Sequence, residues 1–158
     1  MLVISYKYKS GSLKRMKLKK SALDFNGVWI LNFAKSDVPP ITKSQILTIE
    51  TDGLNVSMRE EIINDKDEVL IISLSGTFDG RDNIVKGTPY ADTVSYRLLS
   101  PYSIEGIAKK DGRVCVKEEA VLSQDGNTVN VTYLSYDQNG KTFRNFGCFE
   151  RIKKNQNY

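Results

Sequence analysis

The chain has 158 residues, of which 40% are hydrophobic and 27% charged, and this composition is typical of a globular domain. It contains no run of about 20 apolar residues, so no transmembrane helix is expected. It also contains no histidine, which excludes the commonest general base and the usual ligands of zinc, copper and haem.

The net charge of +4 is concentrated at the N-terminus. Residues 1–20 hold seven Lys and Arg and no acid, which leaves 16 basic and 19 acidic residues in the rest of the chain. A nucleic-acid-binding domain carries its positive charge on the folded surface, so we expect no nucleic-acid partner. We interpret residues 1–23 as a basic, flexible tail, residues 24–152 as one folded domain and residues 153–158 as a polar C-terminal tail.

The basic N-terminal stretch is not typical of a secretory signal. Its apolar segment, residues 2–4, is far shorter than the roughly 7–15 residues that such a signal needs. The sequence as it stands therefore predicts a cytoplasmic protein, with export as the alternative, and Met16 offers a second start. In a reducing compartment we expect Cys115 and Cys148 to be free thiols, and a single bridge is the alternative.

From residue 27 onward the sequence is typical of short strands separated by tight turns. In the first of these strands Trp29, Leu31 and Phe33 share one face, and Asp-Gly or Asn-Gly pairs mark several of the later turns. Because nearly every connection is short enough for a hairpin, neighbouring strands are expected to be antiparallel. We expect strands at residues 27–34, 45–50, 54–63, 69–78, 83–86, 93–99, 103–109, 113–123, 128–136 and 141–152.

This succession of strands predicts an all-β fold, an antiparallel up-and-down meander closed into a β-barrel of about 8–10 strands. Closure hides the edges of a long meander, and a barrel of this size encloses room for one small ligand. A β-sandwich is the alternative, although it would usually need longer crossover connections than this sequence contains.

Three residues near the ends of the expected barrel resemble the closure of lipocalin-like (calycin) barrels. Gly27 and Trp29 lie on the first expected strand, and Arg151 lies at the end of the last. In that superfamily an arginine near the end of the last strand packs across the first-strand tryptophan. The resemblance therefore implies a cation–π contact between Trp29 and Arg151 that closes the barrel floor.

A longer pattern is similar to a group of uncharacterised bacterial lipocalin-like proteins. The resemblance covers about residues 24–152, and it rests on residues 27–36, 87–93, 104–106 and 109–112 in this order. The chain lacks the Thr-Asp-Tyr-type motif and the C-terminal helix of typical lipocalins, and it lacks the two-helix lid of fatty-acid-binding proteins. The resemblance thus implies the fold, and no ligand is carried over from either branch.

Polar residues that interrupt apolar strand faces are the candidates for ligand contacts. Glu60, Glu118, Tyr96 and Tyr133 each lie in phase with an apolar face, so two carboxyls and two phenols line the barrel if these faces point inward. The alternative is a local bulge that reverses the phase and leaves the acids in water. With apolar neighbours added, the predicted ligand-binding set is Met58, Glu60, Leu74, Phe78, Tyr96, Glu118 and Tyr133.

The remaining polar candidates have simpler interpretations. Arg59 and Arg144 could reach a carboxylate ligand, but we expect them on the outer face of the barrel. Asp79 and Asp82 lack the spacing of a calcium loop and are typical of turns. We therefore expect no metal and no cofactor, and we assign no catalytic residue.

These observations favour binding of a small apolar or amphipathic molecule inside the barrel, without catalysis. One alternative is a barrel cyclase or isomerase that acts on an apolar substrate through Glu60 or Glu118. Another is a protein-interaction or inhibitor module that uses the loops at residues 38–42 and 88–92, which a filled barrel with an apolar patch at those loops would favour. No motif identifies the ligand or the oligomeric state.

Overall fold

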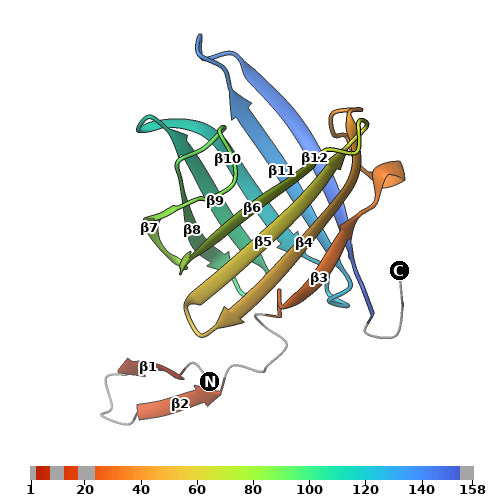
Figure 1. The fold of residues 1–158 in the computed structure, drawn as a ribbon. Coiled ribbons are helices and arrows are strands. Elements are labelled where there is room, and N and C mark those ends of the chain that lie inside the picture. The colour runs from red at the N-terminus through yellow and green to blue at the C-terminus, as the bar shows by residue number, and fades with distance from the viewer. Residues whose placement is uncertain (1–2, 8–12, 18–23, 154–158) are drawn as a thin grey trace.

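The computed structural model describes residues 3–7, 13–17 and 24–153, which form two antiparallel sheets (Figure 1). In the smaller sheet, β1 (Val3–Lys7) pairs with β2 (Leu13–Lys17). These two strands were not expected from the sequence, but the Val, Ile and Tyr residues of this basic stretch favour extended backbone. The rest of the two expected tails, residues 1–2, 8–12, 18–23 and 154–158, lies outside the described residues.

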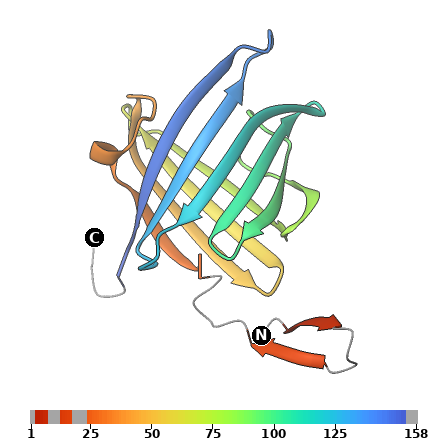
Figure 2. The same ribbon diagram turned by 180° about the vertical axis from the view of Figure 1, so that it is seen from behind.

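The larger sheet is an up-and-down meander that curls into a barrel (Figures 1 and 2), so the predicted fold class is confirmed and a barrel forms rather than a sandwich. β7 starts earlier than expected, and most other bounds agree within a few residues. The ten strands are β3 (Gly27–Leu31), β4 (Thr42–Asp52), β5 (Asn55–Asn64), β6 (Val69–Thr77), β7 (Asp79–Ile84), β8 (Thr93–Ser100), β9 (Ser103–Lys110), β10 (Arg113–Leu122), β11 (Thr128–Tyr136) and β12 (Thr142–Arg151).

Closure of the barrel depends on two joins. The first and last strands of the barrel, β3 and β12, pair antiparallel with Trp29 opposite Arg151. The edges of the sheet are therefore β6 and β7, in the middle of the chain. Within the described residues one isolated bridge joins β6 to the segment that follows β7, with backbone hydrogen bonds of 3.0 and 2.9 Å between Ser73 and Lys86. The barrel is thus nearly closed, and this β6–β7 seam is its weakest join.

The floor of the barrel is built around the only tryptophan. Trp29 is fully buried, and its indole nitrogen donates to the Phe25 carbonyl at 3.0 Å. The Arg151 guanidinium lies 4.1 Å from the Trp29 ring centroid. Its nitrogens also donate to the carbonyls of Asp24 at 2.8 Å and Gly126 at 2.7 Å, so one cation ties three segments of chain together.

Gly27 makes this arrangement possible. Its φ is +140°, and a Cβ at this position would lie 2.7 Å from Nη1 of Arg151. Because an L side chain rarely adopts this backbone conformation and would also collide with the guanidinium, only glycine suits the position. The resulting floor is compatible with a lipocalin-like fold.

The first strand of the barrel ends earlier than the sequence predicts, so the expected inward face is wrong at Phe33. Phe33 does not continue the face of Trp29 and Leu31, because β3 ends at Leu31 and a 3₁₀ turn, η2 (Phe33–Lys35), follows. Phe33 is consequently exposed. The side-chain oxygen of Asn32 accepts a hydrogen bond from the backbone of η2, and such a local partner competes with strand pairing.

Candidate functional site

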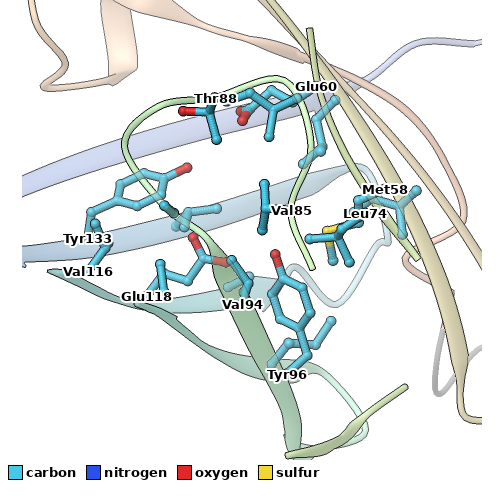
Figure 3. A pocket seen from close by; sticks show the side chains of 18 of the residues that line it. Met58, Glu60, Leu74, Val85, Thr88, Val94, Tyr96, Val116, Glu118 and Tyr133 are labelled. Carbon is cyan, nitrogen blue, oxygen red and sulfur yellow. The ribbon is translucent and has the colours of Figure 1, made fainter. Parts of the chain in front are cut away.

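The interior of the barrel contains a cavity of about 320 Å³ (Figure 3). Its walls are mainly apolar, and they are formed by residues of β4, β5, β6 and β8 to β11, together with Phe25 and the segment between β7 and β8. The volume corresponds to about ten waters in the liquid, which is at the lower end of the range for small-molecule sites. The barrel is therefore hollow above its packed floor.

The structure places most of the predicted ligand-binding residues around this cavity. Those that line it are Met58, Glu60, Leu74, Tyr96, Glu118 and Tyr133. Phe78 does not line it, because it is buried behind Tyr96 in an edge-to-face contact with ring centroids 6.4 Å apart. Phe78 thus supports the wall and does not face the cavity.

The strand pleat explains why both glutamates face inward. Glu60 on β5 lies opposite Leu47 on β4 and Ile72 on β6, and all three line the cavity. On β10 a bulge occurs between Val114 and Val116, which places it before Glu118. The alternation from Val116 onward is therefore intact, and neither acid is left in bulk water.

Gly106 gives the Glu118 side chain its space. It lies on β9, opposite Tyr96 on β8 and opposite Glu118 on β10, while Glu118 in turn lies opposite Tyr133 on β11. A Cβ on Gly106 would lie only 2.5 Å from Oε1 of Glu118. The side chain of Glu118 therefore crosses β9 toward Tyr96, and three polar side chains form one row in the wall.

A second polar pair lies on the other side of the cavity. The side-chain nitrogen of Gln45 on β4 donates to Oε1 of Glu60 at 2.5 Å. Gln45 and Gly106 are site residues that the sequence analysis missed. The signal was present for both, because each lies in an otherwise apolar inward-facing register, and a glycine inside a strand often marks a close approach.

Burial controls the ionisation of these groups. The pKa of Glu118 is raised to about 7, mainly by burial and also by the charge of Glu60, while a hydrogen bond from Tyr96 opposes the shift. Burial also raises the pKa of Glu60, against the hydrogen bond from Gln45. The pKa values of Tyr96 and Tyr133 lie well above normal because of burial and the nearby carboxylates. Glu118 can thus exchange a proton near neutral pH while both phenols stay protonated.

The loop at residues 85–92 contributes one wall of the cavity. Thr88, Tyr90 and Ala91 line it from this side, whereas none of residues 38–42, the other loop singled out from the sequence, does so. Asp92 holds the end of the loop in place, because its carboxylate accepts a hydrogen bond from Lys110 at 2.6 Å. This loop is therefore part of the site.

The other candidates named from the sequence lie outside the cavity. Arg59 pairs with Glu61 at 3.0 Å on the outer surface, and Arg144 is exposed. Asp79 caps its own turn, which lowers its pKa to about 2 through hydrogen bonds with Thr77 and Arg81. Within the described residues no group of three potential metal ligands occurs.

The two cysteines do not form a bridge. Both are free thiols. Cys115 is partly buried and lines the cavity, whereas Cys148 is buried on β12. Burial raises the pKa of both thiols, which keeps them in the less reactive protonated form.

No protein-family model matches this chain, and no curated protein matches it. In the described part of the chain, no helix has the length and apolar composition needed to cross a bilayer.

Proposed function

We propose that this protein is a lipocalin-like barrel that binds one small, mostly apolar molecule in its interior. The observation that carries the proposal is the cavity of about 320 Å³, whose walls are mainly apolar and interrupted by few polar groups. Pre-formed sites for small molecules generally have this composition, in which apolar walls supply affinity and a few polar groups fix orientation. The contact between Trp29 and Arg151 supports the lipocalin-like assignment.

The test is to fill the cavity. Ala120 lines it on β10, whereas its neighbour Val121 is 41% exposed on the outer face. Native mass spectrometry with a panel of neutral apolar molecules, among them aromatic metabolites, retinoids and lipids, should detect binding to the wild type and to Val121→Phe. Ala120→Phe should lose that binding while it keeps the emission of buried Trp29. Equal binding by both variants would place the ligand elsewhere and refute the proposal.

A second candidate function is acid–base catalysis on an apolar substrate, and Glu118 favours it. A carboxyl with a pKa of about 7 can accept and return a proton at neutral pH. Tyr96 and Tyr133 stay protonated beside it, so their hydroxyls can donate to an oxygen on which negative charge develops. A barrel isomerase or cyclase would need this combination.

Catalysis of this kind can be detected without knowing the substrate. Small apolar ketones incubated with the protein in heavy water should incorporate deuterium next to the carbonyl, as measured by NMR. Glu118→Gln should abolish the exchange, and Glu119→Gln, which changes an exposed side chain of the same strand, should not. If the wild type gives no exchange above buffer, the catalytic candidate is wrong and the binding proposal is unaffected.

We do not extend the proposal to a protein-interaction module. A filled barrel would have favoured that alternative, whereas this barrel encloses a cavity.

A further inference from the structure

The charged groups of the cavity all have the same sign. Glu60 and Glu118 are the ionisable acids of its wall, and the described residues that line it include no lysine or arginine. The other polar side chains of the lining belong to Gln, Ser, Thr, Tyr and Cys. A ligand inside the barrel therefore meets negative charge without a compensating cation.

This distribution of charge discriminates strongly between ligands. A carboxylate or phosphate ligand would be removed from water and placed beside like charges, which is doubly unfavourable at low dielectric. A cation would also lose its hydration, but a buried carboxylate with hydrogen bonds to spare can offset that loss. An apolar molecule with one positive charge fits both the walls and the acids.

We propose that the ligand of this cavity is a small apolar amine, bound as its ammonium ion against the Glu118 carboxylate, with Glu60 as a second negative charge. The inference rests on the proposed binding function, and it adds the charge and the chemical class of the ligand.

The hydrogen-bonding groups around Glu118 suit an ammonium ion. Such an ion has three donors and no acceptor, so it needs oxygen atoms around it. The Glu118 carboxylate supplies two, and the Tyr133 hydroxyl points into the cavity beside it (Figure 3). Tyr96 faces the same carboxyl from β8. Glu60, whose Oε1 already accepts from Gln45, acts mainly through its charge.

Binding of an amine should release protons. The groups that face Glu118 are Tyr96 on β8, Tyr133 on β11 and Glu60 on β5, and none of them is cationic. A bound cation favours the ionised carboxylate and lowers its pKa. Amine affinity should consequently rise as the pH increases through about 7. A carboxylate ligand would show the opposite dependence, because it would bind best when Glu118 is protonated.

The experiment compares three probes of nearly equal shape: 3-phenylpropylamine, 3-phenylpropanol and 3-phenylpropanoate. Isothermal titration of the full-length protein at several pH values, in two buffers of different ionisation enthalpy, gives both affinity and proton release. We expect the amine to bind at least about tenfold more tightly than the alcohol above pH ~7, and the carboxylate to bind most weakly.

Variants connect this preference to the two acids. Glu118→Gln should remove most of the amine's advantage over the alcohol, and Glu60→Gln should have a smaller effect in the same direction. The controls are Glu119→Gln and Glu61→Gln, which remove one negative charge from the outward-facing neighbour of each acid. Both controls should keep the amine preference.

The outcomes separate the inference from the function on which it rests. If the alcohol or the carboxylate binds as tightly as the amine, or if Glu118→Gln keeps the preference, the charge assignment is wrong and the binding function stands. If none of the three probes binds and the neutral panel also fails to occupy the cavity, both are wrong.

Discussion

At the scale of single residues, Trp29 is the side chain on which the floor of the barrel most depends. It is fully buried, and it packs between the core and the Arg151 guanidinium. Trp29→Ala should lower the free energy of unfolding by about 3–5 kcal/mol, the usual loss for emptying a buried aromatic site. Domains of this size are stable by about 5–15 kcal/mol, so a loss of this magnitude is enough to unfold a domain at the lower end of that range.

Thermal or urea unfolding followed by circular dichroism measures this loss. Val28→Ala is the matched control, because Val28 neighbours Trp29 on β3 but is 36% exposed. If the two variants shift the transition equally, Trp29 does not close the barrel.

Glu118 makes the stability of the ligand-free barrel depend on pH. Its pKa is about 7 in the folded protein and near 4.5 in the unfolded chain, so the folded state binds protons more tightly. Stability is therefore highest below pH 4.5 as far as this group is concerned, and it falls as the pH rises toward 7. The difference amounts to on the order of 3 kcal/mol, since one pKa unit corresponds to about 1.4 kcal/mol.

Urea unfolding of wild type and Glu118→Gln at a series of pH values tests this expectation. The variant should gain stability relative to the wild type across this window and differ little below it. The comparison cancels the opposite dependence of surface acids such as Asp79, whose pKa is lowered. If the difference between the two proteins is the same at every pH, the Glu118 carboxyl is not shielded from water in the folded state.

The sequence predicts individual site residues wherever alternation decides which way they point. Glu60, Glu118, Tyr96 and Tyr133 could be placed on inward faces because strand residues alternate strictly. Gln45 could not be paired with Glu60 in advance, because that contact depends on the register between two strands. Register is a property of the assembled sheet rather than of either segment.

At the scale of elements, the β6–β7 seam has only one isolated bridge in place of a continuous ladder of backbone hydrogen bonds, and close packing against two glycines brings its edges together. A Cβ on Gly76 of β6 would lie 2.2 Å from atoms of the Asn83 side chain of β7, which therefore occupies the space over the glycine. Beyond β7, a Cβ on Gly87 would lie 1.8 Å from the Ile71 carbonyl oxygen. The close approach of the two edges thus requires a glycine on each side.

Gly87→Ala should open this seam. Gly87 has a φ of +86°, so alanine there would suffer both backbone strain, about 1–3 kcal/mol, and collision with the Ile71 carbonyl. Gly112→Ala is the control, because Gly112 has a φ of +72° and no atom near its absent Cβ. Unfolding should show a clearly larger loss for Gly87→Ala, and hydrogen exchange should locate the added opening at Ser73 and Lys86. Equal losses would mean that backbone strain alone is responsible and that the seam is loose.

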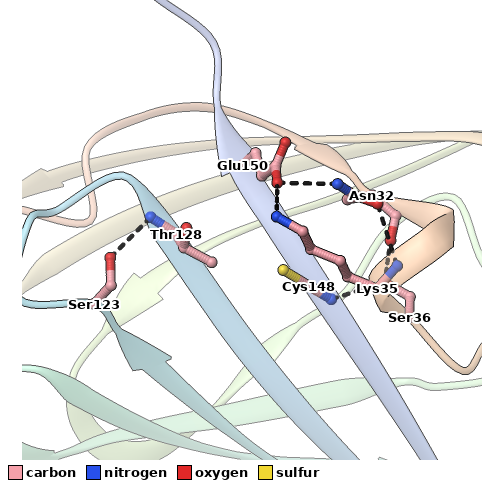
Figure 4. Close-up of polar contacts among 7 residues, drawn as sticks. All are labelled: Asn32, Lys35, Ser36, Ser123, Thr128, Cys148 and Glu150. Atoms are coloured by element: carbon pink, nitrogen blue, oxygen red, sulfur yellow. Dashed lines mark hydrogen bonds and ion pairs between the residues drawn. The ribbon is translucent and has the colours of Figure 1, made fainter.

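The sequence also predicts most of the strands, but it does not predict the η2 turn or the place where the barrel closes. Ten strands and their turns follow from alternation and Asp-Gly or Asn-Gly pairs. The η2 turn was missed because distant partners add to its local Asn32 cap: Glu150 on β12 accepts hydrogen bonds from Asn32 at 3.0 Å and Lys35 at 2.9 Å (Figure 4). The position of the seam was missed for a related reason, since barrel curvature decides which two strands meet last.

At the scale of the whole molecule, the interior and the surface have different electrostatic roles. The ion pairs of the described chain, such as Lys109 with Asp82, lie at partly exposed positions, where each contributes little to stability. The acids of the cavity have no such partners. We therefore expect added salt to change the stability of the protein only slightly, whereas pH should change it strongly.

The order of strands in the sheet has a consequence for how the chain could be rearranged. All barrel neighbours are consecutive in sequence except β3 and β12, whose pairing joins the two ends of the domain. Those ends already touch, since Nη2 of Arg151 lies 2.8 Å from the Asp24 carbonyl. A circular permutant that links Ile152 to Asp24 through a short loop and starts at Asp79 would run from one edge of the seam to the other. Every strand ladder would then be local in sequence, while the Ser73–Lys86 bridge across the seam would become long-range.

Such a permutant should fold faster than the natural chain. Folding rates of small domains fall as the mean sequence separation of contacts rises, and this cut replaces the one long-range ladder with the single Ser73–Lys86 bridge as the long-range backbone pairing. A second permutant that starts at Gly112 is the control, because it makes the β9–β10 pair long-range in its place. Stopped-flow refolding should rank the seam permutant first, and a seam permutant that refolds no faster than the natural chain would show that β3–β12 pairing is not the slow step. If the seam permutant refolds faster than the natural chain, the strand order that closes the natural barrel through its ends is also what delays its folding.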